Sequence, residues 1–125
     1  MAPIHRILIV DDEAEFLELM RSALEIRGFE VVTASNAVEA GMEISGKLPE
    51  LILMDIRMPG INGLQACEAI KRNPITQDVP IIIISALAGD SDIKKARKIG
   101  ISDYFIKPVD MEKLINRIKE LLKVS

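Results

Sequence analysis

Short apolar runs alternate with helical segments along the whole chain, and this alternation constrains the fold more than any other feature. Five runs of apolar, β-branched or aromatic residues have the length of β-strands. Two of them, residues 51–54 and 81–84, are apolar at every position, which is typical of central strands in a parallel sheet that is covered on both faces. The predicted strands are residues 4–10, 29–34, 51–54, 81–84 and 103–106.

The segments between these strands have the period of amphipathic helices. The first of them carries Phe16, Leu19, Met20 and Ala23 at the i, i+3, i+4, i+7 spacing of a buried helix face, and Gly28 suits its end. The predicted helices are residues 13–27, 36–45, 63–72, 91–99 and 110–123. The last of them has a predicted buried stripe formed by Leu114, Ile115, Ile118, Leu121 and Leu122.

Five strands that alternate with five helices predict an α/β fold in a single domain, residues 1–125. Right-handed crossovers give a doubly wound, five-stranded parallel sheet in the order 2-1-3-4-5, counted along the chain, as in flavodoxin-like proteins. The functional site of such a sheet lies outside the carboxyl ends of its strands, near the point between strands one and three where the order reverses.

Composition and charge argue against several other classes of protein. No apolar run approaches the roughly 20 residues of a membrane span, and the N-terminus lacks the layout of a signal peptide. Cys67 is the only cysteine, which excludes an internal disulfide and fits the reducing cytoplasm. A net charge of −3 argues against bulk binding of nucleic acid.

The charge is unevenly distributed along the chain. Residues 1–65 hold 5 basic and 11 acidic residues, whereas residues 89–125 hold 9 basic and 6 acidic residues. An acidic first half suits a cation site and a basic last third suits an acidic partner surface, although solvated helix faces explain the same pattern.

Charged and polar residues follow the predicted strands at the edge where the site is expected. They are Asp11, Asp12 and Glu13 after the first strand, Asp55 after the third, Ser85 after the fourth, and Lys107 with Pro108 after the fifth. Converging carboxylates repel one another unless a cation offsets their charge, and oxygen ligands suit Mg²⁺. Such a site attracts phosphate, whose remaining oxygens a lysine and a hydroxyl can bind. On the central strand, Asp55 is the natural nucleophile for phosphoryl transfer.

Four segments at these strand ends form a specific combination. They are Val10-Asp11-Asp12-Glu13, Met54-Asp55-Ile56-Arg57-Met58-Pro59-Gly60-Ile61-Asn62-Gly63, Ile83-Ile84-Ser85-Ala86 and Asp103-Tyr104-Phe105-Ile106-Lys107-Pro108. In this order and spacing, the chain resembles the receiver domains of response regulators in two-component signalling, including the chemotaxis regulators, over essentially its whole length. By this resemblance, Asp55 is the expected phosphoacceptor. The chain is then expected to be a phosphoprotein that takes part in a phosphorelay.

The resemblance also implies a metal site around the acceptor. Asp12 is the expected direct Mg²⁺ ligand, Asp11 binds through water, and Asp55 and the backbone carbonyl of Arg57 complete the protein ligands. Lys107 is expected to bind the phosphoryl group.

The resemblance further implies a switch. Ser85 is the expected switch hydroxyl and Tyr104 the switch aromatic, and the Lys107–Pro108 bond is expected to be cis. Movement of Ser85 toward the phosphoryl group lets the ring of Tyr104 rotate inward. This rotation changes the face formed by the fourth helix, fifth strand and fifth helix, where a downstream target or output domain binds.

The implied mechanism is attack of Asp55 on the phosphohistidine of a sensor histidine kinase or a histidine phosphotransfer protein, or on a small phosphodonor. The chain then catalyses only its own phosphorylation and slow dephosphorylation, so it is not an enzyme in the usual sense. In this family the first helix is a docking surface for the helices of the kinase or of the phosphotransfer protein, and we expect Phe16 rather than Leu17 to reach the rim of the acidic pocket.

Two positions are expected to tune the lifetime of the phosphorylated state, and here they are Arg57 and Leu87. Both side chains are large and Leu87 is apolar, so we expect them to obstruct or misorient the attacking water. Alternatively, Arg57 simply pairs with Glu13 across the mouth of the pocket.

Other functions fit the residues less well. A Mg²⁺-dependent phosphohydrolase normally has a second Asp at the position of Arg57, and a flavin carrier needs a phosphate-binding loop where Asp11-Asp12-Glu13 stands. A receiver-like module that works without phosphorylation would not need the complete acceptor site. The cognate kinase, and whether the chain stands alone or comes from a longer regulator, stay open.

Overall fold

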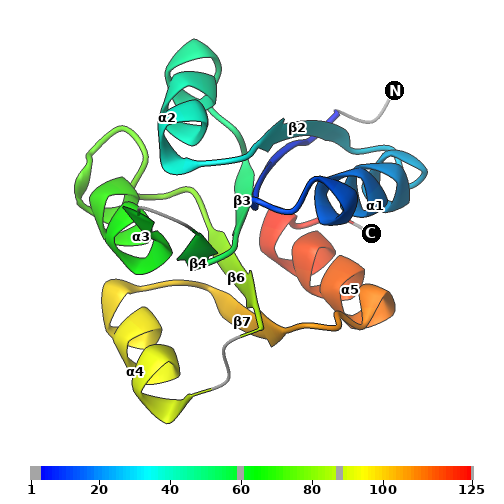
Figure 1. Ribbon diagram of the computed structural model, residues 1–125. Helices are drawn as coiled ribbons and strands as arrows, with labels where there is room; N and C mark the ends of the chain where they lie inside the picture. Colours follow the sequence, from blue (N-terminus) through cyan, green and yellow to red (C-terminus); the bar gives the residue numbers. More distant parts are fainter. Residues whose placement is uncertain (1–3, 59–60, 87–88, 125) are drawn as a thin grey trace.

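The computed structural model describes residues 4–58, 61–86 and 89–124, in which strands and helices alternate (Figure 1). The strands are β1 (Arg6–Val10), β2 (Glu30–Ala34), β3 (Leu51–Met54), β4 (Arg57–Met58), β5 (Ile61–Asn62), β6 (Ile81–Ser85) and β7 (Asp103–Ile106). The helices are α1 (Ala14–Glu25), α2 (Ala37–Gly46), α3 (Gly63–Arg72), α4 (Asp90–Ile99) and α5 (Met111–Leu122). Every predicted helix and strand is present, with small shifts at the ends. Among the described residues, no helix is both long and apolar enough to cross a membrane.

The five longer strands form one parallel sheet in the order β2-β1-β3-β6-β7. This order is the predicted 2-1-3-4-5 arrangement, so the doubly wound, flavodoxin-like fold is confirmed. The labels differ because β4 and β5 form a separate antiparallel pair between β3 and α3, which the apolar pattern does not reveal.

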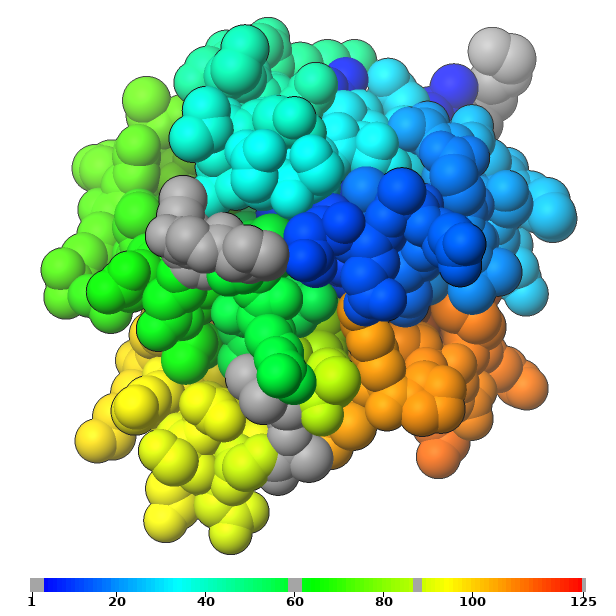
Figure 2. Space-filling model, viewed as in Figure 1, coloured from blue at the N-terminus to red at the C-terminus, as the bar shows by residue number. Residues whose placement is uncertain are grey.

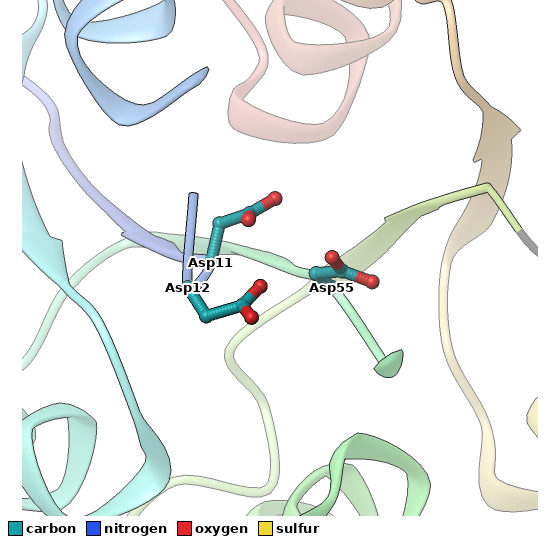
Figure 3. A group of neighbouring side chains, drawn as sticks. All are labelled: Asp11, Asp12 and Asp55. Atoms are coloured by element: carbon teal, nitrogen blue, oxygen red, sulfur yellow. The ribbon is translucent and has the colours of Figure 1, made fainter. Parts of the chain in front are cut away.

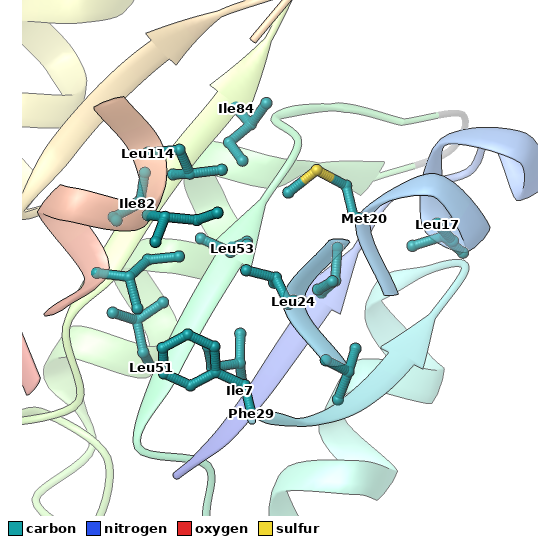
Figure 4. Close-up of a cluster of buried hydrophobic side chains, with 14 residues drawn as sticks. Ile7, Leu17, Met20, Leu24, Phe29, Leu51, Leu53, Ile82, Ile84 and Leu114 are labelled. Atoms are coloured by element: carbon teal, nitrogen blue, oxygen red, sulfur yellow. The ribbon is translucent and has the colours of Figure 1, made fainter. Parts of the chain in front are cut away.

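The sheet is covered on both faces, α1 and α5 lying on one side and α2, α3 and α4 on the other (Figure 1). Side chains of the central strands alternate between the two resulting cores. In β1, Ile7 and Ile9 belong to the core on the α1–α5 side (Figure 4), whereas Leu8 and Val10 belong to the other. Full burial of such a side chain contributes about 1.5–3 kcal/mol, so the rigid sheet provides a stable base for the residues at its edge.

Helix α1 turns only part of the predicted apolar face toward the sheet: Met20 is buried and Phe16 packs against the core, as predicted. Leu17, Met20 and Leu24 are buried, while Leu19 is 64% exposed. Two sets of apolar residues have helical spacing: an outer set with Leu19 and Ala23, and an inner set with Leu17 and Leu24. The inner set packs against the sheet, because Leu24 buries more apolar surface than Ala23 would.

Capping side chains fix the ends of several helices. Asn36, Asn62 and Asp110 accept backbone N–H bonds at the starts of α2, α3 and α5. Gly100 ends α4 with φ 98°, a left-handed conformation that favours glycine. The capped starts of α2 and α5 lie within a few residues of the carboxyl ends of β2 and β7.

Candidate functional site

Acidic, polar and basic residues from four strand ends meet at one edge of the sheet. Asp11 and Asp12 follow β1, Asp55 follows β3, Ser85 ends β6 and Lys107 follows β7. The backbone N–H of Lys107 donates to the carbonyl of Ser85 at 2.9 Å, which extends the β6–β7 pairing to this lysine. The sheet thereby brings together side chains that are far apart in the sequence.

Three carboxylates form the centre of this group. One oxygen from each of Asp11, Asp12 and Asp55 lies within 4.8 Å of the others, and Figure 3 shows the side chains next to one another at the ends of β1 and β3. Asp11 is fully buried and Asp55 is 5% exposed, whereas Asp12 is exposed. This set of oxygens is the kind that Mg²⁺ prefers.

Its surroundings disfavour the charged form of Asp11. Burial raises the pKa of Asp11, even though hydrogen bonds from Lys107 and from the backbone N–H of Glu13 act in the opposite direction. The charge of Asp55 raises this pKa further. A bound cation would offset both burial and repulsion, so the residues present fit a divalent metal ion.

The ammonium of Lys107 is held among the carboxylates. Its Nζ lies 2.8 Å from Asp11 Oδ2, 3.0 Å from Glu13 Oε1 and 3.5 Å from Asp55 Oδ2. Burial lowers the pKa of Lys107, but the bonds to Asp11 and Glu13 and the charges of Asp11 and Asp55 together raise it above its ordinary value. The lysine is therefore a fixed cation beside Asp55. The Lys107–Pro108 peptide bond is cis.

The turn after β3 orients Asp55. Its Oδ1 accepts the backbone N–H of Arg57 at 2.9 Å, while Oδ2 faces Lys107. At the start of α3, the N–H of Gly63 donates to the carbonyl of Ile56 at 3.1 Å. A Cβ at Gly63 would lie 2.3 Å from the Cα of Ile56, so only glycine allows this close approach. The backbone next to Asp55 is thus held from two sides.

A cavity of about 500 Å³ opens beside Asp55. It is lined by Asp12, Glu13, Asp55, Arg57, Met58, Ala86 and Lys107. Because anionic and cationic side chains line the same space, the cavity suits a ligand that combines a metal cation with a phosphoryl anion.

The two predicted switch residues lie on neighbouring strands. Ser85 is fully buried at the end of β6. Tyr104 is half-buried on β7, where it pairs with Ile83 of β6. Burial raises the pKa of Tyr104, and the charges of Asp92 and Asp55 add to this effect. Leu87, one of the two positions expected to tune phosphoryl lifetime, lies outside the described residues.

Two contacts of Lys107 were not anticipated from the sequence. Glu13 binds Lys107 and, in the part of the chain that the structure describes, forms no ion pair with Arg57, whose side chain is exposed. Phe16 is half-buried, and the centroid of its ring lies 4.1 Å from Lys107 Nζ. Glu13 and Lys107 are 94 positions apart and follow strands that are not neighbours in the sheet, so neither local spacing nor strand pairing indicates the first contact.

Comparison with known proteins gives a consistent picture at the level of sequence. The model of the response regulator receiver domain matches residues 7–119. The phosphate regulon transcriptional regulatory protein PhoB of Pseudomonas aeruginosa is 37% identical over 117 residues, which cover 94% of this chain and 51% of PhoB. The response regulator PleD of Caulobacter vibrioides is 35% identical over 118 residues, which cover 94% of this chain and 26% of PleD. The chain thus spans about half the length of PhoB and a quarter of PleD.

Solved structures agree with the sequence relatives. A receiver domain protein described as CheY-like from Methanospirillum hungatei superposes with a TM-score of 0.91 at 30% identity, covering 97% of this chain and 95% of that one. A putative response regulator from Chloroflexus aurantiacus gives a TM-score of 0.90 at 31% identity, with 97% and 99% covered. The chain belongs to the response regulator receiver domains of two-component signalling.

Proposed function

We propose that Asp55 accepts a phosphoryl group from the phosphohistidine of a sensor histidine kinase or a histidine phosphotransfer protein. The observation that carries the proposal is the gathering of the Asp11 and Asp12 carboxylates and the Lys107 ammonium around the Asp55 side chain. As a receiver domain, the chain is a signalling protein rather than an enzyme with turnover on an external substrate. In this proposal it catalyses only its own phosphorylation and slow dephosphorylation.

Mg²⁺ is the cofactor that fits the carboxylates. Asp11, Asp12, Asp55 and the backbone carbonyl of Arg57 would hold the ion, which when bound offsets the negative charge of the phosphoryl oxygens. Both oxygens of Asp11 are already engaged, one by Lys107 and the other by the N–H of Glu13. The Nζ of Lys107 is closer to Asp11 Oδ2, at 2.8 Å, than to Asp55 Oδ2, at 3.5 Å, so Asp11 is the more firmly engaged of the two carboxylates. This difference supports a role for Asp11 through a bridging water, with direct binding assigned to Asp12, Asp55 and the carbonyl of Arg57.

The chain's own residues orient the reacting groups. The N–H of Arg57 fixes Oδ1 of Asp55, so we assign attack on phosphorus to Oδ2. An oxygen–phosphorus bond forms as the nitrogen–phosphorus bond of phosphohistidine breaks, and the imidazole leaves. Lys107 then transfers a hydrogen bond from its carboxylate partners to a phosphoryl oxygen, and the Ser85 hydroxyl donates to another.

The phosphorylated state is read, in this proposal, on the face formed by α4, β7 and α5. Ser85 ends β6 and lies against β7, which carries Tyr104, so movement of the serine toward Asp55 reaches that face through one strand pair. The face includes a basic group on α4, formed by Lys94, Lys95, Arg97 and Lys98. A downstream target or an output domain would bind there. PhoB is named a transcriptional regulatory protein and is about twice the length matched here.

The reset of the signal depends on water that attacks the Asp55 phosphoryl group. Arg57 lines the cavity, and we propose that it and Leu87 slow this attack, which gives a long-lived signal. The phosphoryl group of an Arg57→Asn and Leu87→Glu double variant should decay faster than that of the unchanged protein. Equal decay rates would rule out this tuning role.

Phosphorylation itself is tested by mass spectrometry after incubation with acetyl phosphate and Mg²⁺. The protein should gain one phosphoryl group, and chelation of the metal or an Asp55→Ala substitution should prevent the gain. Phosphorylation that persists in Asp55→Ala would overturn the assignment of the acceptor. We place the reaction in the cytoplasm, whose reducing conditions suit the free, buried thiol of Cys67.

A further inference from the structure

We propose that Phe16 is a positioning residue for Lys107: the face of its ring holds the ammonium beside Asp55. The inference rests on the proposed phosphoryl transfer and adds a residue to it. The Nζ of Lys107 lies 4.1 Å from the centroid of the Phe16 ring. A cation within about 6 Å of an aromatic face is attracted by the negative potential of the ring.

The ring completes the surroundings of the ammonium. The acceptor oxygens of Asp11, Glu13 and Asp55 lie at 2.8, 3.0 and 3.5 Å from Nζ, so three oxygens face a group that has three N–H donors. The ring of Phe16 covers a further part of the ammonium surface with an apolar face rather than with water. The ring therefore stabilises the ammonium in the pocket relative to solvent, in addition to the hydrogen bonds that the ammonium already donates.

The place of Phe16 on α1 makes its ring a fixed support. Leu17 and Met20 of the same helix are buried against the sheet, so α1 cannot rotate without exposing them. Phe16 itself is half-buried and lines a groove of about 410 Å³ that runs between α1 and the start of α5. Glu13 and Lys107 line both this groove and the acidic cavity, whereas the ring lines the groove and Asp55 lines the cavity.

A lysine needs such support more than most side chains. Its ammonium stands on a flexible four-carbon stem with many rotamers, and it is strongly hydrated in water. Lys107 must redirect a hydrogen bond from its carboxylate partners to a phosphoryl oxygen on Asp55, whereas its contact with the ring needs no such exchange. We therefore expect loss of the aromatic face to slow phosphorylation without abolishing it.

The experiment varies the electron density of the ring at constant shape. Phenylalanine with one to five fluorine atoms is incorporated at position 16, and the phosphorylation rate is measured with acetyl phosphate at saturating Mg²⁺. The rate should fall progressively with fluorination, by about two- to fivefold overall, because fluorine weakens the attraction of the ring for a cation. The same substitution at Phe29, which is buried in the core on the α1–α5 side of the sheet, is the matched control and should leave the rate unchanged.

Side-chain exchange gives a second series. Phe16→Tyr and Phe16→Trp should retain the rate, whereas Phe16→Leu should reduce it by about two- to fivefold. The NMR signals of the Lys107 ε-methylene protons report the contact without any phosphorylation, because a ring face shifts them upfield. This shift should disappear in Phe16→Leu and persist in Phe16→Tyr.

The outcomes separate this inference from the proposed function. A rate that is independent of fluorination in a protein that is phosphorylated would overturn the positioning role of Phe16 alone. Failure of the unchanged protein to accept a phosphoryl group would overturn both the positioning role of Phe16 and the proposed function. If Phe16→Leu does not fold, the fluorinated series decides, because fluorination keeps the shape of the ring.

Discussion

At the residue scale, the acidic group at the sheet edge contains repulsion that Lys107 offsets only in part. Burial and the charge of Asp55 both act to raise the pKa of Asp11, against the hydrogen bonds that Lys107 and Glu13 provide. Carboxylates that converge in this way lower the free energy of unfolding unless a cation offsets their charge. The residues that serve the proposed function are not the ones that maximise stability.

Replacement of Asp55 should show how much this repulsion lowers the free energy of unfolding. Asp55→Asn keeps the size of the side chain and removes one charge, so the metal-free protein should gain on the order of 1 kcal/mol in its free energy of unfolding. Phosphorylation by acetyl phosphate should be lost in the same variant. Urea unfolding in the presence of a chelator measures the gain. The control is Asp78→Asn, an exposed position where we expect a change within about 0.5 kcal/mol. A loss of stability in Asp55→Asn would show that repulsion is not the main effect of this charge.

At the scale of single elements, α1 illustrates the limit of periodicity. Its sequence contains two apolar stripes that are one residue out of phase, and both have helical spacing. Periodicity correctly predicts the helix and its length, but only packing against the sheet determines which stripe is buried. The outer stripe, which contains the exposed Leu19, is the one that the spacing had favoured.

A pair of leucines on α1 tests this assignment. Leu24 is fully buried, so Leu24→Ala should lower the free energy of unfolding by about 2–5 kcal/mol. Leu19 is mostly exposed, and Leu19→Ala should change it by less than about 0.5 kcal/mol. Both variants place the same residue on the same helix, so differences in helix propensity cancel. Equal losses would mean that Leu19 is covered in solution.

The turn between β3 and α3 depends on Gly63. A Cβ there would lie 2.3 Å from the Cα of Ile56 and 2.7 Å from the carbonyl oxygen of Asp55, so the backbone must move. We expect Gly63→Ala to cost about 1–3 kcal/mol of unfolding free energy and to slow phosphorylation of Asp55, since the turn orients that carboxylate.

Gly41 offers the matched control for this substitution. It lies inside α2, and a Cβ at this position would meet nothing within 4 Å. Gly41→Ala should therefore stabilise the protein by about 0.5–1 kcal/mol and leave phosphorylation unchanged. A Gly63→Ala protein with unchanged stability and rate would show that the turn relaxes without cost.

At the scale of the whole molecule, the fold and the edge that carries the site follow from the sequence pattern. Residues 51–54 and 81–84, which lie in β3 and β6, are apolar at every position, which predicts a central parallel pair. The rule for doubly wound sheets then assigns Asp11, Asp55 and Lys107 to one edge. The contacts of Glu13 and Phe16 with Lys107 could not be predicted in this way. They depend on the rotation of α1 and on side-chain rotamers, which local spacing does not determine.

Metal binding should stabilise the whole domain, because only the folded chain brings the three carboxylates together. At a Mg²⁺ concentration 100 times the dissociation constant, the free energy of unfolding should rise by about 2.7 kcal/mol. Urea unfolding with Mg²⁺, with chelator, and with NaCl at matched ionic strength measures the effect. Asp12→Asn should reduce the stabilisation strongly. A similar gain from NaCl alone would indicate general screening rather than a site.

The pH dependence of folding at alkaline pH should report on the buried thiol of α3. Burial raises the pKa of Cys67 to about 12 from its ordinary value of 9.0. The unfolded chain therefore loses this proton first as the pH rises, so the stabilising contribution is complete below pH 9 and declines between pH 9 and about 12. At pH 10.5 the unfolded thiol is largely ionised, and this group alone should lower the free energy of unfolding by about 2 kcal/mol relative to pH 8.

Urea unfolding at both pH values, in the unchanged protein and in Cys67→Ala, isolates this effect from the titration of lysines and of Tyr104, which both proteins share. Cys67→Ala should be less stable at pH 8, because it leaves a small cavity, and should lose less stability on going to pH 10.5. Parallel losses in the two proteins would show that the thiol ionises in the folded state as readily as in the unfolded chain.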